Sequence, residues 1–379
     1  MKKLIALLAI TGIMANARPA EAQKIIPKFI RKMYFEKDTS KHSSFVVLPV
    51  LSSAPETGIE AGGAALYSFY SDTLHHDTRV SNIYGYATVT TKGQNRLSLS
   101  TTYWSPQNKY HYSASIGRMD FPFTFYGIGN NTAKADGVNV GQKRYRLMLE
   151  AQKLVTKNIY IGLVGGGYKY NFDSNNLTSI YYSSQVQDRA GGTYLYLGPS
   201  FIFDTRNNNT YTTKGMMLNA YYQLLQGVFG NNNYQGGFLN VEYTAFQQLS
   251  KRFVLGFDVQ EQSLTGARSP FYLLPQMGSD EMMRGYYGGR YRDRNFIAGQ
   301  TELRYRLNER IGVVGFLGTG EVFHKSFTFQ ALKPNYGGGL RYFFDVEKGL
   351  SIRADYGIGQ KPFGEQRESG FYMGLGEAF

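Results

Sequence analysis

Hydrophobic and polar side chains alternate along most of this chain, from about residue 44 to residue 379. In residues 302–307, for example, charged side chains alternate with Leu303, Tyr305 and Leu307. A period of two is typical of β-strands that have one polar and one apolar face. The apolar face is rich in Tyr and Phe, whereas the core of a soluble β-sandwich would carry mainly Ile, Val and Leu. The pattern therefore favours strands whose apolar face contacts lipid.

Sixteen segments show this alternation, and single-chain bacterial outer-membrane barrels have an even number of strands. The tilted strands of such barrels need about 9–11 residues to cross a bilayer. We therefore predict an all-β fold, a 16-stranded antiparallel transmembrane β-barrel over residues 44–379. The predicted strands cover residues 44–52, 57–70, 79–91, 95–104, 109–118, 139–154, 158–171, 190–204, 213–225, 235–248, 252–264, 295–308, 310–322, 335–346, 349–357 and 369–379.

The lengths of the connections favour the same fold. Short turns follow even-numbered strands, as at residues 157–158 and 308–309, and should lie in the periplasm. Longer connections, which should be extracellular loops, follow odd-numbered strands at residues 119–138, 172–189, 265–294, 323–334 and 358–368. This division between the two ends is typical of an outer-membrane barrel.

The predicted last strand has an apolar face that ends in an aromatic residue. This is the C-terminal strand signal of outer-membrane barrels. The residues that share this face are Phe371, Met373, Leu375 and Phe379.

The N-terminus has the order of a secretory signal peptide. Two lysines precede an apolar run over residues 4–14, and the small residues of a cleavage site end at Ala22. We predict a signal peptide at residues 1–22 and a basic periplasmic leader at residues 23–43. Apolar residues of the leader recur at helical spacing, so it is either a short amphipathic helix or a solvated segment before the first strand.

Composition narrows the chemistry that the chain can perform. Its 379 residues include no Cys, which excludes disulfides, thiolate metal sites and cysteine nucleophiles. The five His residues stand in no triad or zinc-binding pattern, so we expect no enzyme activity, no metal site and no cofactor. The formal net charge of +13 suits contact with outer-membrane lipid and lipopolysaccharide, and export makes a nucleic-acid partner remote.

Four segments have sequences that are more specific than the alternation of a generic barrel requires. They are Phe-Pro-Phe and Tyr-Gly-Ile-Gly-Asn-Asn-Thr in residues 121–132, Phe-Asp-Thr-Arg-Asn and Thr-Lys-Gly in residues 203–215, Met-Arg-Gly-Tyr-Tyr-Gly in residues 283–288, and Arg-Ala-Asp-Tyr-Gly to Gly-Leu-Gly in residues 353–376. Together, and in matching order over residues 44–379, they resemble the BamA/TamA superfamily of outer-membrane barrels, also called the bacterial surface antigen family.

The resemblance implies a specific role for the Arg-Gly-Tyr segment. In this family the segment belongs to a long loop between strands 11 and 12 that folds back into the barrel lumen. In this sequence the corresponding loop covers residues 265–294. The motif residues within it are Arg284, Gly285, Tyr286 and Tyr287.

The resemblance also implies acidic partners for Arg284 on the barrel wall. Glu302 stands where the family carries an acidic residue on strand 12. The family's Asp on strand 13 is replaced by Gly318, and this leaves Glu321 and Asp355 as candidates for the second acceptor.

The family resemblance implies an outer-membrane location and a function in outer-membrane biogenesis or protein translocation. Envelope assembly proteins or client proteins would then be its partners. Typical relatives carry periplasmic POTRA modules before the barrel, whereas only residues 23–43 are available for one here. The alternative function is that of a passive channel or a structural barrel subunit of an envelope complex.

Overall fold

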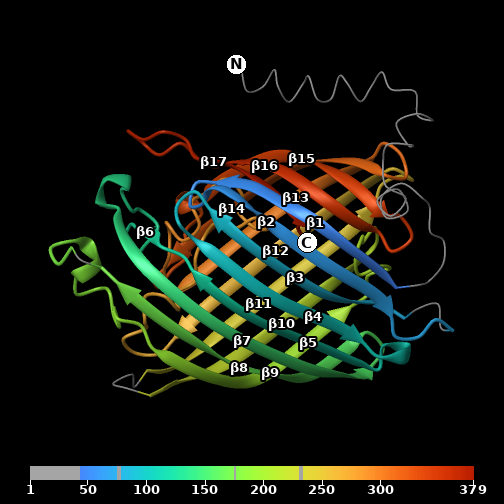
Figure 1. The fold of residues 1–379 in the computed structure, drawn as a ribbon, viewed down its shortest axis with the longest axis horizontal. Helices are drawn as coiled ribbons and strands as arrows, with labels where there is room; N and C mark the ends of the chain where they lie inside the picture. Colours follow the sequence, from blue (N-terminus) through green and yellow to red (C-terminus); the bar gives the residue numbers. More distant parts are fainter. Residues whose placement is uncertain (1–42, 75–77, 175, 230–233) are drawn as a thin grey trace.

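A computed structural model describes residues 43–74, 78–174, 176–229 and 234–379 (Figure 1). The predicted signal peptide and residues 23–42 of the predicted leader lie outside the described residues. The strands and single-turn 3-10 helices are β1 (Ser44–Ala54), β2 (Gly58–Tyr70), β3 (Val80–Thr90), β4 (Asn95–Trp104), η1 (Pro106–Asn108), β5 (Tyr110–Asp120), β6 (Phe123–Phe125), η2 (Lys134–Asp136), β7 (Val138–Thr156), β8 (Ile159–Asp173), η3 (Ile180–Tyr182), β9 (Thr193–Asp204), β10 (Gly215–Val228), β11 (Gln235–Gln248), β12 (Phe253–Thr265), β13 (Asn295–Arg306), β14 (Ile311–Phe323), η4 (Phe329–Ala331), β15 (Lys333–Asp345), β16 (Leu350–Ile358) and β17 (Ser369–Leu375).

Sixteen of these strands form a closed antiparallel barrel in which β17 returns to β1 (Figure 1). The short strand β6 is not part of the wall, because it pairs only with the first residues of β7, and β5 pairs directly with β7. The predicted 16-stranded barrel is confirmed. Most predicted strands agree with the observed ones to within a few residues at each end.

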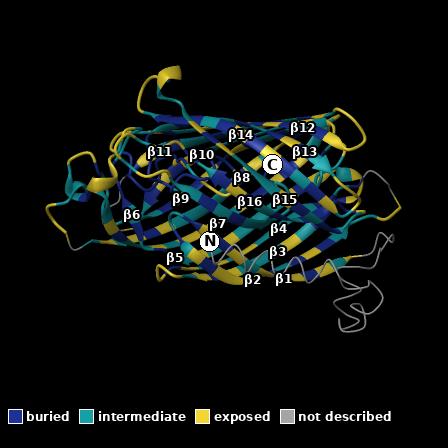
Figure 2. Cartoon of the chain, turned by 90° about the horizontal axis from the view of Figure 1, so that it is seen from above, coloured by how far each residue is buried: buried dark blue, intermediate teal, exposed yellow. Residues whose placement is uncertain are grey.

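Alternation along each strand gives the wall two chemically different faces. On β7, Tyr145, Leu147 and Leu149 are exposed on the outer face, while Glu150 and Gln152 are buried on the inner face. Figure 2 shows the same alternation of exposed and buried residues on the other strands. Because neighbouring strands satisfy one another's backbone hydrogen bonds over most of the wall, the apolar outer face can contact lipid.

The two ends of the barrel differ in the length of their connections. Long connections at one end cover residues 121–137, 174–192, 266–294 and 359–368, whereas β7 and β8 are joined at the other end by the turn at residues 157–158. Outer-membrane barrels place long loops outside the cell and short turns in the periplasm. The end with the long loops is therefore the extracellular end. In the described part of the chain, no helix is long and apolar enough to cross a membrane.

The C-terminal strand is shorter than predicted. β17 ends at Leu375, because Gly376 has a φ of +78° and turns the chain out of the sheet. Glycine reaches this left-handed conformation without the steric cost that a Cβ atom brings. The prediction that the strand extends to Phe379, with Phe379 on its apolar face, is therefore wrong.

The other residues of the predicted C-terminal signal remain on β17. Phe371 and Met373 alternate with the buried Tyr372, whose hydroxyl accepts a hydrogen bond from a loop inside the barrel. They therefore lie on the outer face. Leu375, at the end of the strand, packs against an apolar cluster that includes Val46.

The last residues of the chain contact the inner wall instead of continuing the sheet. Glu377 Oε2 accepts a hydrogen bond from Arg341 Nε at 2.6 Å. The carbonyl oxygen of Phe379 accepts one from Arg304 Nη2 at 2.9 Å, and its ring stacks on Phe246 with centroids 5.7 Å apart. Arginines that face the lumen thus provide the attraction that turns this C-terminal tail, residues 376–379, inward.

Replacing Phe379 with alanine should lower the free energy of unfolding by about 1–2 kcal/mol. The variant loses the stacking on Phe246 and the contact with the Arg304 guanidinium, which lies 4.8 Å from the Phe379 ring centre. Urea unfolding in lipid vesicles, followed through the fluorescence of the single tryptophan Trp104, measures the change. Phe379→Leu keeps most of the apolar contact and should lose less. An unchanged unfolding midpoint in both variants would show that the tail is not anchored.

Candidate functional site

Arg284 lies on the connection between β12 and β13, the eleventh and twelfth strands of the barrel wall, and its side chain is completely buried. Its Nη2 atom is 2.7 Å from Glu302 Oε1, and its Nη1 atom is 2.6 Å from Asp355 Oδ2. The guanidinium also lies 3.5 Å from the centre of the Phe316 ring. Charge-assisted hydrogen bonds to two carboxylates offset the cost of removing an arginine from water.

Arg284, Glu302 and Asp355 belong to a larger charge network, whose members are buried except for Asp280, whose side chain is 52% exposed. Glu302 also accepts a hydrogen bond from Arg304 Nε at 3.0 Å, and Asp355 accepts one from Arg341 Nη1 at 2.5 Å. The network balances four arginines against four carboxylates. Its members are Arg284, Arg304, Arg341, Arg353, Asp280, Glu302, Asp355 and Glu377.

The second acceptor of Arg284 is Asp355, and the other predicted candidate, Glu321, is not in contact with it. Glu321 instead accepts a hydrogen bond from the backbone N–H of Thr328 at 3.1 Å. Gly318 is closely packed, because a Cβ atom there would lie 2.7 Å from Asn335 Oδ1 and 3.0 Å from Gln300 Cβ. The acidic partner therefore comes from β16 instead of β14.

Sequence reasoning missed three polar or aromatic neighbours of Arg284. Gln300 Oε1 accepts a hydrogen bond from Arg284 Nη2 at 3.1 Å, and Asn335 Nδ2 donates one to the Arg284 carbonyl at 3.1 Å. The third is Phe316, which stacks on the guanidinium. Strand alternation could have found Gln300, because it shares the inner face of β13 with Glu302.

Gly285 fits a position that a larger residue cannot occupy. Its φ is +101°, and a Cβ atom would lie 2.7 Å from backbone atoms of Gly357, Ile358 and Gly359 at the end of β16. Its N–H donates a hydrogen bond to the Tyr372 hydroxyl of β17 at 2.9 Å. The loop backbone therefore packs directly against the last two strands of the barrel.

The two tyrosines of the motif fix the loop on either side. The Tyr286 hydroxyl donates a hydrogen bond to the carbonyl of Pro334 at 2.6 Å. The Tyr287 hydroxyl accepts one from the backbone N–H of Thr124 at 2.7 Å. The motif thus ties residues near β15 to the extracellular loop that contains β6.

An ion pair ties the same loop to the loop before β17. Arg290 Nη2 is 2.7 Å from Glu365 Oε2, and Arg290 Nη1 is 3.5 Å from Glu368 Oε1. Burial opposes ionisation of Glu365, but a backbone hydrogen bond from Lys134 and the Arg290 guanidinium hold the pKa of this carboxyl below its ordinary value. The charged pair therefore persists at neutral pH.

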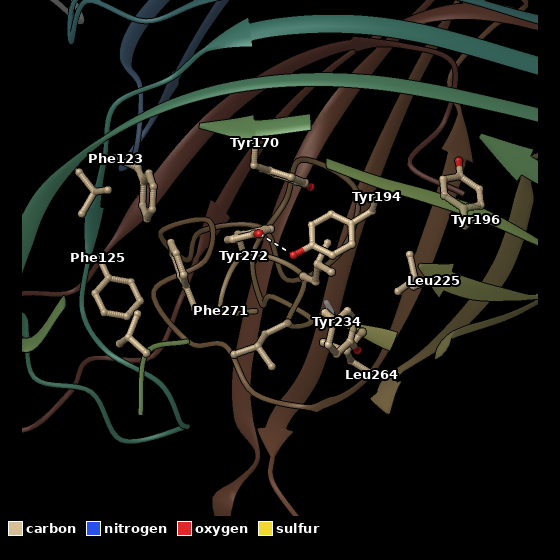
Figure 3. Packing of buried hydrophobic residues seen from close by; sticks show 14 of the residues in the cluster. Phe123, Phe125, Tyr170, Tyr194, Tyr196, Leu225, Tyr234, Leu264, Phe271 and Tyr272 are labelled. Atoms are coloured by element: carbon tan, nitrogen blue, oxygen red, sulfur yellow. Dashed lines mark hydrogen bonds between the residues drawn. The ribbon is translucent and has the colours of Figure 1, made fainter. Parts of the chain in front are cut away.

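The first part of the loop is held by an aromatic cluster (Figure 3). Phe271 and Tyr272 of the loop pack against residues that include Phe125 of β6 and Tyr194 of β9, and the hydroxyls of Tyr272 and Tyr194 are 2.7 Å apart. Asp188 accepts hydrogen bonds from both hydroxyls, at 2.5 and 2.6 Å. The loop is therefore anchored to opposite sides of the barrel, by aromatic packing at β8 to β12 and by charge at β13 to β17.

The junction between β1 and β17, which we call the seam, has the shortest pairing in the wall. The two strands share one registered pair, Ser53 with Phe371. By contrast, β1 pairs with β2 along its whole length, and β17 pairs with β16 from Ser369 to Leu375. The ladder between β1 and β17 is therefore much shorter than that between any other two neighbouring strands of the described wall.

A cavity of about 860 Å³ inside the barrel meets the seam, the loop and the C-terminal tail. Its lining includes Leu48 of β1, Asp280 of the loop, Arg353 of β16 and Glu377 of the tail. Charged groups from three separate parts of the chain therefore line one cavity. A movement of the loop or of the tail would change the charge that lines the inner side of the seam.

Comparison with known proteins identifies one family and several structures. Residues 83–379 match the family described as the Omp85 superfamily domain. No curated protein sequence matches the chain. The structure of BamA from Haemophilus ducreyi lacking POTRA domains 1–3 is similar with a TM-score of 0.57 and 12% identity, over 89% of this chain and 70% of that one.

Two CdiB structures have the same fold. CdiB from Acinetobacter baumannii gives a TM-score of 0.55 and 13% identity, over 88% of this chain and 60% of that one. CdiB from Escherichia coli gives 0.55 and 9% identity, over 89% of this chain and 63% of that one. This chain therefore spans less than two thirds of the length of either CdiB chain.

Proposed function

Because this chain belongs to the Omp85 superfamily, we propose that its barrel inserts, exports or supports other envelope proteins, and so acts in outer-membrane biogenesis or protein translocation. The similar barrels of BamA and CdiB support this reading. Partners would be envelope assembly proteins or unfolded client proteins. The proposal assigns the barrel no catalytic step, metal or cofactor.

The single observation that carries the proposal is the seam. Only Ser53 and Phe371 are in register across it, so little ladder pairing opposes its opening. A strand edge with little ladder pairing is a template on which another strand can be added through backbone hydrogen bonds. The edge of β1 that faces β17 is therefore the place where a client strand would first pair.

The buried loop motif is placed where it can control this edge. Arg284 pairs with Asp355 of β16, and the Gly285 N–H bonds to Tyr372 of β17. The loop thus holds the strand that forms one side of the seam. Release of the motif would free β17 to move away from β1, and rebinding would close the barrel.

The proposed function can be tested with the purified full chain in lipid vesicles. A urea-denatured outer-membrane barrel protein, delivered with a periplasmic chaperone, is the client, and its folded fraction is measured by gel mobility without boiling. We expect the client to fold several-fold faster than in vesicles that contain an unrelated barrel of similar size. Equal folding rates in the two kinds of vesicle would contradict the proposal.

A conductance measurement separates the proposal from the passive-channel alternative. In planar bilayers, a passive channel would give steady conductance that does not depend on a client. A barrel filled by the loop and the C-terminal tail should instead be closed most of the time. Steady conductance together with no effect on client folding would favour the channel.

A further inference from the structure

The outer wall of the barrel carries a groove that the proposed function does not use. It has a volume of about 1070 Å³, extends across β1 to β9 and is lined almost entirely by apolar atoms. This wall runs through the blue to green strands of Figure 1. The groove exists because several residues on the outer face have small side chains. They include Gly63, Ala65, Gly85, Ala87 and Gly167.

The strand register shows how the floor of the groove is built. One row of directly paired residues crosses eight strands of the wall, and every member is apolar. The row consists of Val47, Ala65, Gly85, Leu99, Ile116, Leu147, Gly167 and Leu195. Residues of this row face the bilayer, so lipid chains can lie against them.

The neighbouring row toward the extracellular end carries polar and positively charged residues instead of apolar ones. Arg118 of β5 pairs with Tyr145 of β7, which pairs with Lys169 of β8, and all three side chains are exposed and line the groove. Within the described chain, neither Arg118 nor Lys169 has a hydrogen-bond or ion-pair partner. Two cations without a described partner therefore flank Tyr145 in one row, next to the apolar floor of the groove.

The acidic residues nearest to this row do not neutralise it. Asp120 lies one row further out and is 4.0 Å from Lys143, with which it forms its own ion pair. Asp173 lies at the end of β8, two rows beyond Lys169, where it faces Gly141. The row of Arg118 and Lys169 thus keeps its positive charge.

We propose that this groove binds a phosphate-bearing lipid of the outer leaflet, of the chemical class of lipid A. The acyl chains would lie in the apolar groove, and the phosphates would contact Arg118 and Lys169. These cations stand two strands apart, which is about 10 Å at the usual strand spacing, so they can serve two phosphates on one headgroup. Their place at the extracellular end of the strands is the depth at which outer-leaflet headgroups meet the barrel.

The proposal is tested by native mass spectrometry of the full chain in detergent, titrated with diphosphoryl lipid A. The variant Arg118→Gln/Lys169→Gln should bind this lipid about 30-fold more weakly, because each cation near a lipid surface contributes roughly a factor of five. The control Lys109→Gln/Lys153→Gln removes two exposed positive charges from the periplasmic end of the same wall. The control should bind like the unchanged chain.

A second variant tests the groove without changing charge. Ala87 is exposed on the outer face, so Ala87→Leu fills the hollow with no effect on the inner packing, and it should weaken binding of the same lipid. A phosphate-free lipid with the same acyl chains should bind more weakly than diphosphoryl lipid A to the unchanged chain. Equal binding by the charge variant and its control, or equal binding of the two lipids, would overturn the proposal and leave only unspecific lipid contact. Client folding is not part of these measurements, so their outcome is separate from that of the proposed function.

Discussion

Replacing Arg284 with alanine is expected to lower the free energy of unfolding of the barrel by about 3–5 kcal/mol. The guanidinium is completely buried and pairs with Glu302 and Asp355. Its removal leaves two buried carboxylates with one counter-charge fewer, which is the costly way to break a buried ion pair. Urea unfolding in lipid vesicles, followed through Trp104 fluorescence, measures the loss.

A matched control and a double-mutant cycle make this expectation specific. Arg268 is an exposed arginine of the same loop, so Arg268→Ala should change stability by less than about 0.5 kcal/mol. Arg284→Ala and Glu302→Ala should be non-additive by about 0.5–3 kcal/mol, because they remove the same interaction. Arg284→Ala and Glu321→Ala should be nearly additive, since Glu321 bonds to Thr328 instead. Additive effects in the first cycle would refute the anchoring role of Arg284.

Locking the seam with a disulfide is expected to abolish the client-folding activity of the barrel. Ser53 and Phe371 are registered partners across the seam, and directly opposed residues have Cα atoms about 4.5–5.5 Å apart, within the range of a disulfide. The chain has no Cys, so Ser53→Cys/Phe371→Cys contains only the intended pair. Client folding in vesicles should stop in the oxidised variant and return after reduction.

A second cysteine pair controls for the effect of the cross-link itself. Ile83 and Thr101 are registered partners on β3 and β4, two strands whose pairing should persist throughout the cycle. The variant Ile83→Cys/Thr101→Cys should therefore stay active in both redox states. Gel mobility without boiling checks that both variants are folded. Full activity of the oxidised seam variant would show that the seam does not need to open.

The alternation of side chains was enough to predict the barrel, because each strand has apolar residues on its lipid-facing side and polar residues on its lumen-facing side. The exposed Leu147 and the buried Glu150 on β7 are an example. The C-terminal tail could not be predicted in this way. Its inward turn depends on Gly376 together with Arg304 and Arg341, which lie on other strands, and alternation alone carries no information on such contacts.

The candidate site was only partly visible in the sequence. The family motif pointed to Arg284 and, by alignment, to Glu302, and the structure brings these two residues together. The sequence could not decide whether Glu321 or Asp355 is the second acceptor of Arg284, because that choice depends on the path of the loop across the lumen. The path is set by close packing of Gly285 on β16, a backbone contact that no side-chain pattern encodes.

Site-specific photocrosslinking tests most directly whether clients enter the barrel at the edge of β1. A photoreactive amino acid is placed at Leu51 of β1 or at Leu149 of β7, two outer-face leucines that are 53% and 51% exposed. With a client trapped during folding, we expect strong adducts from position 51 and few or none from position 149. Equal adducts from both positions, or none from position 51 while the client still folds, would contradict this expectation.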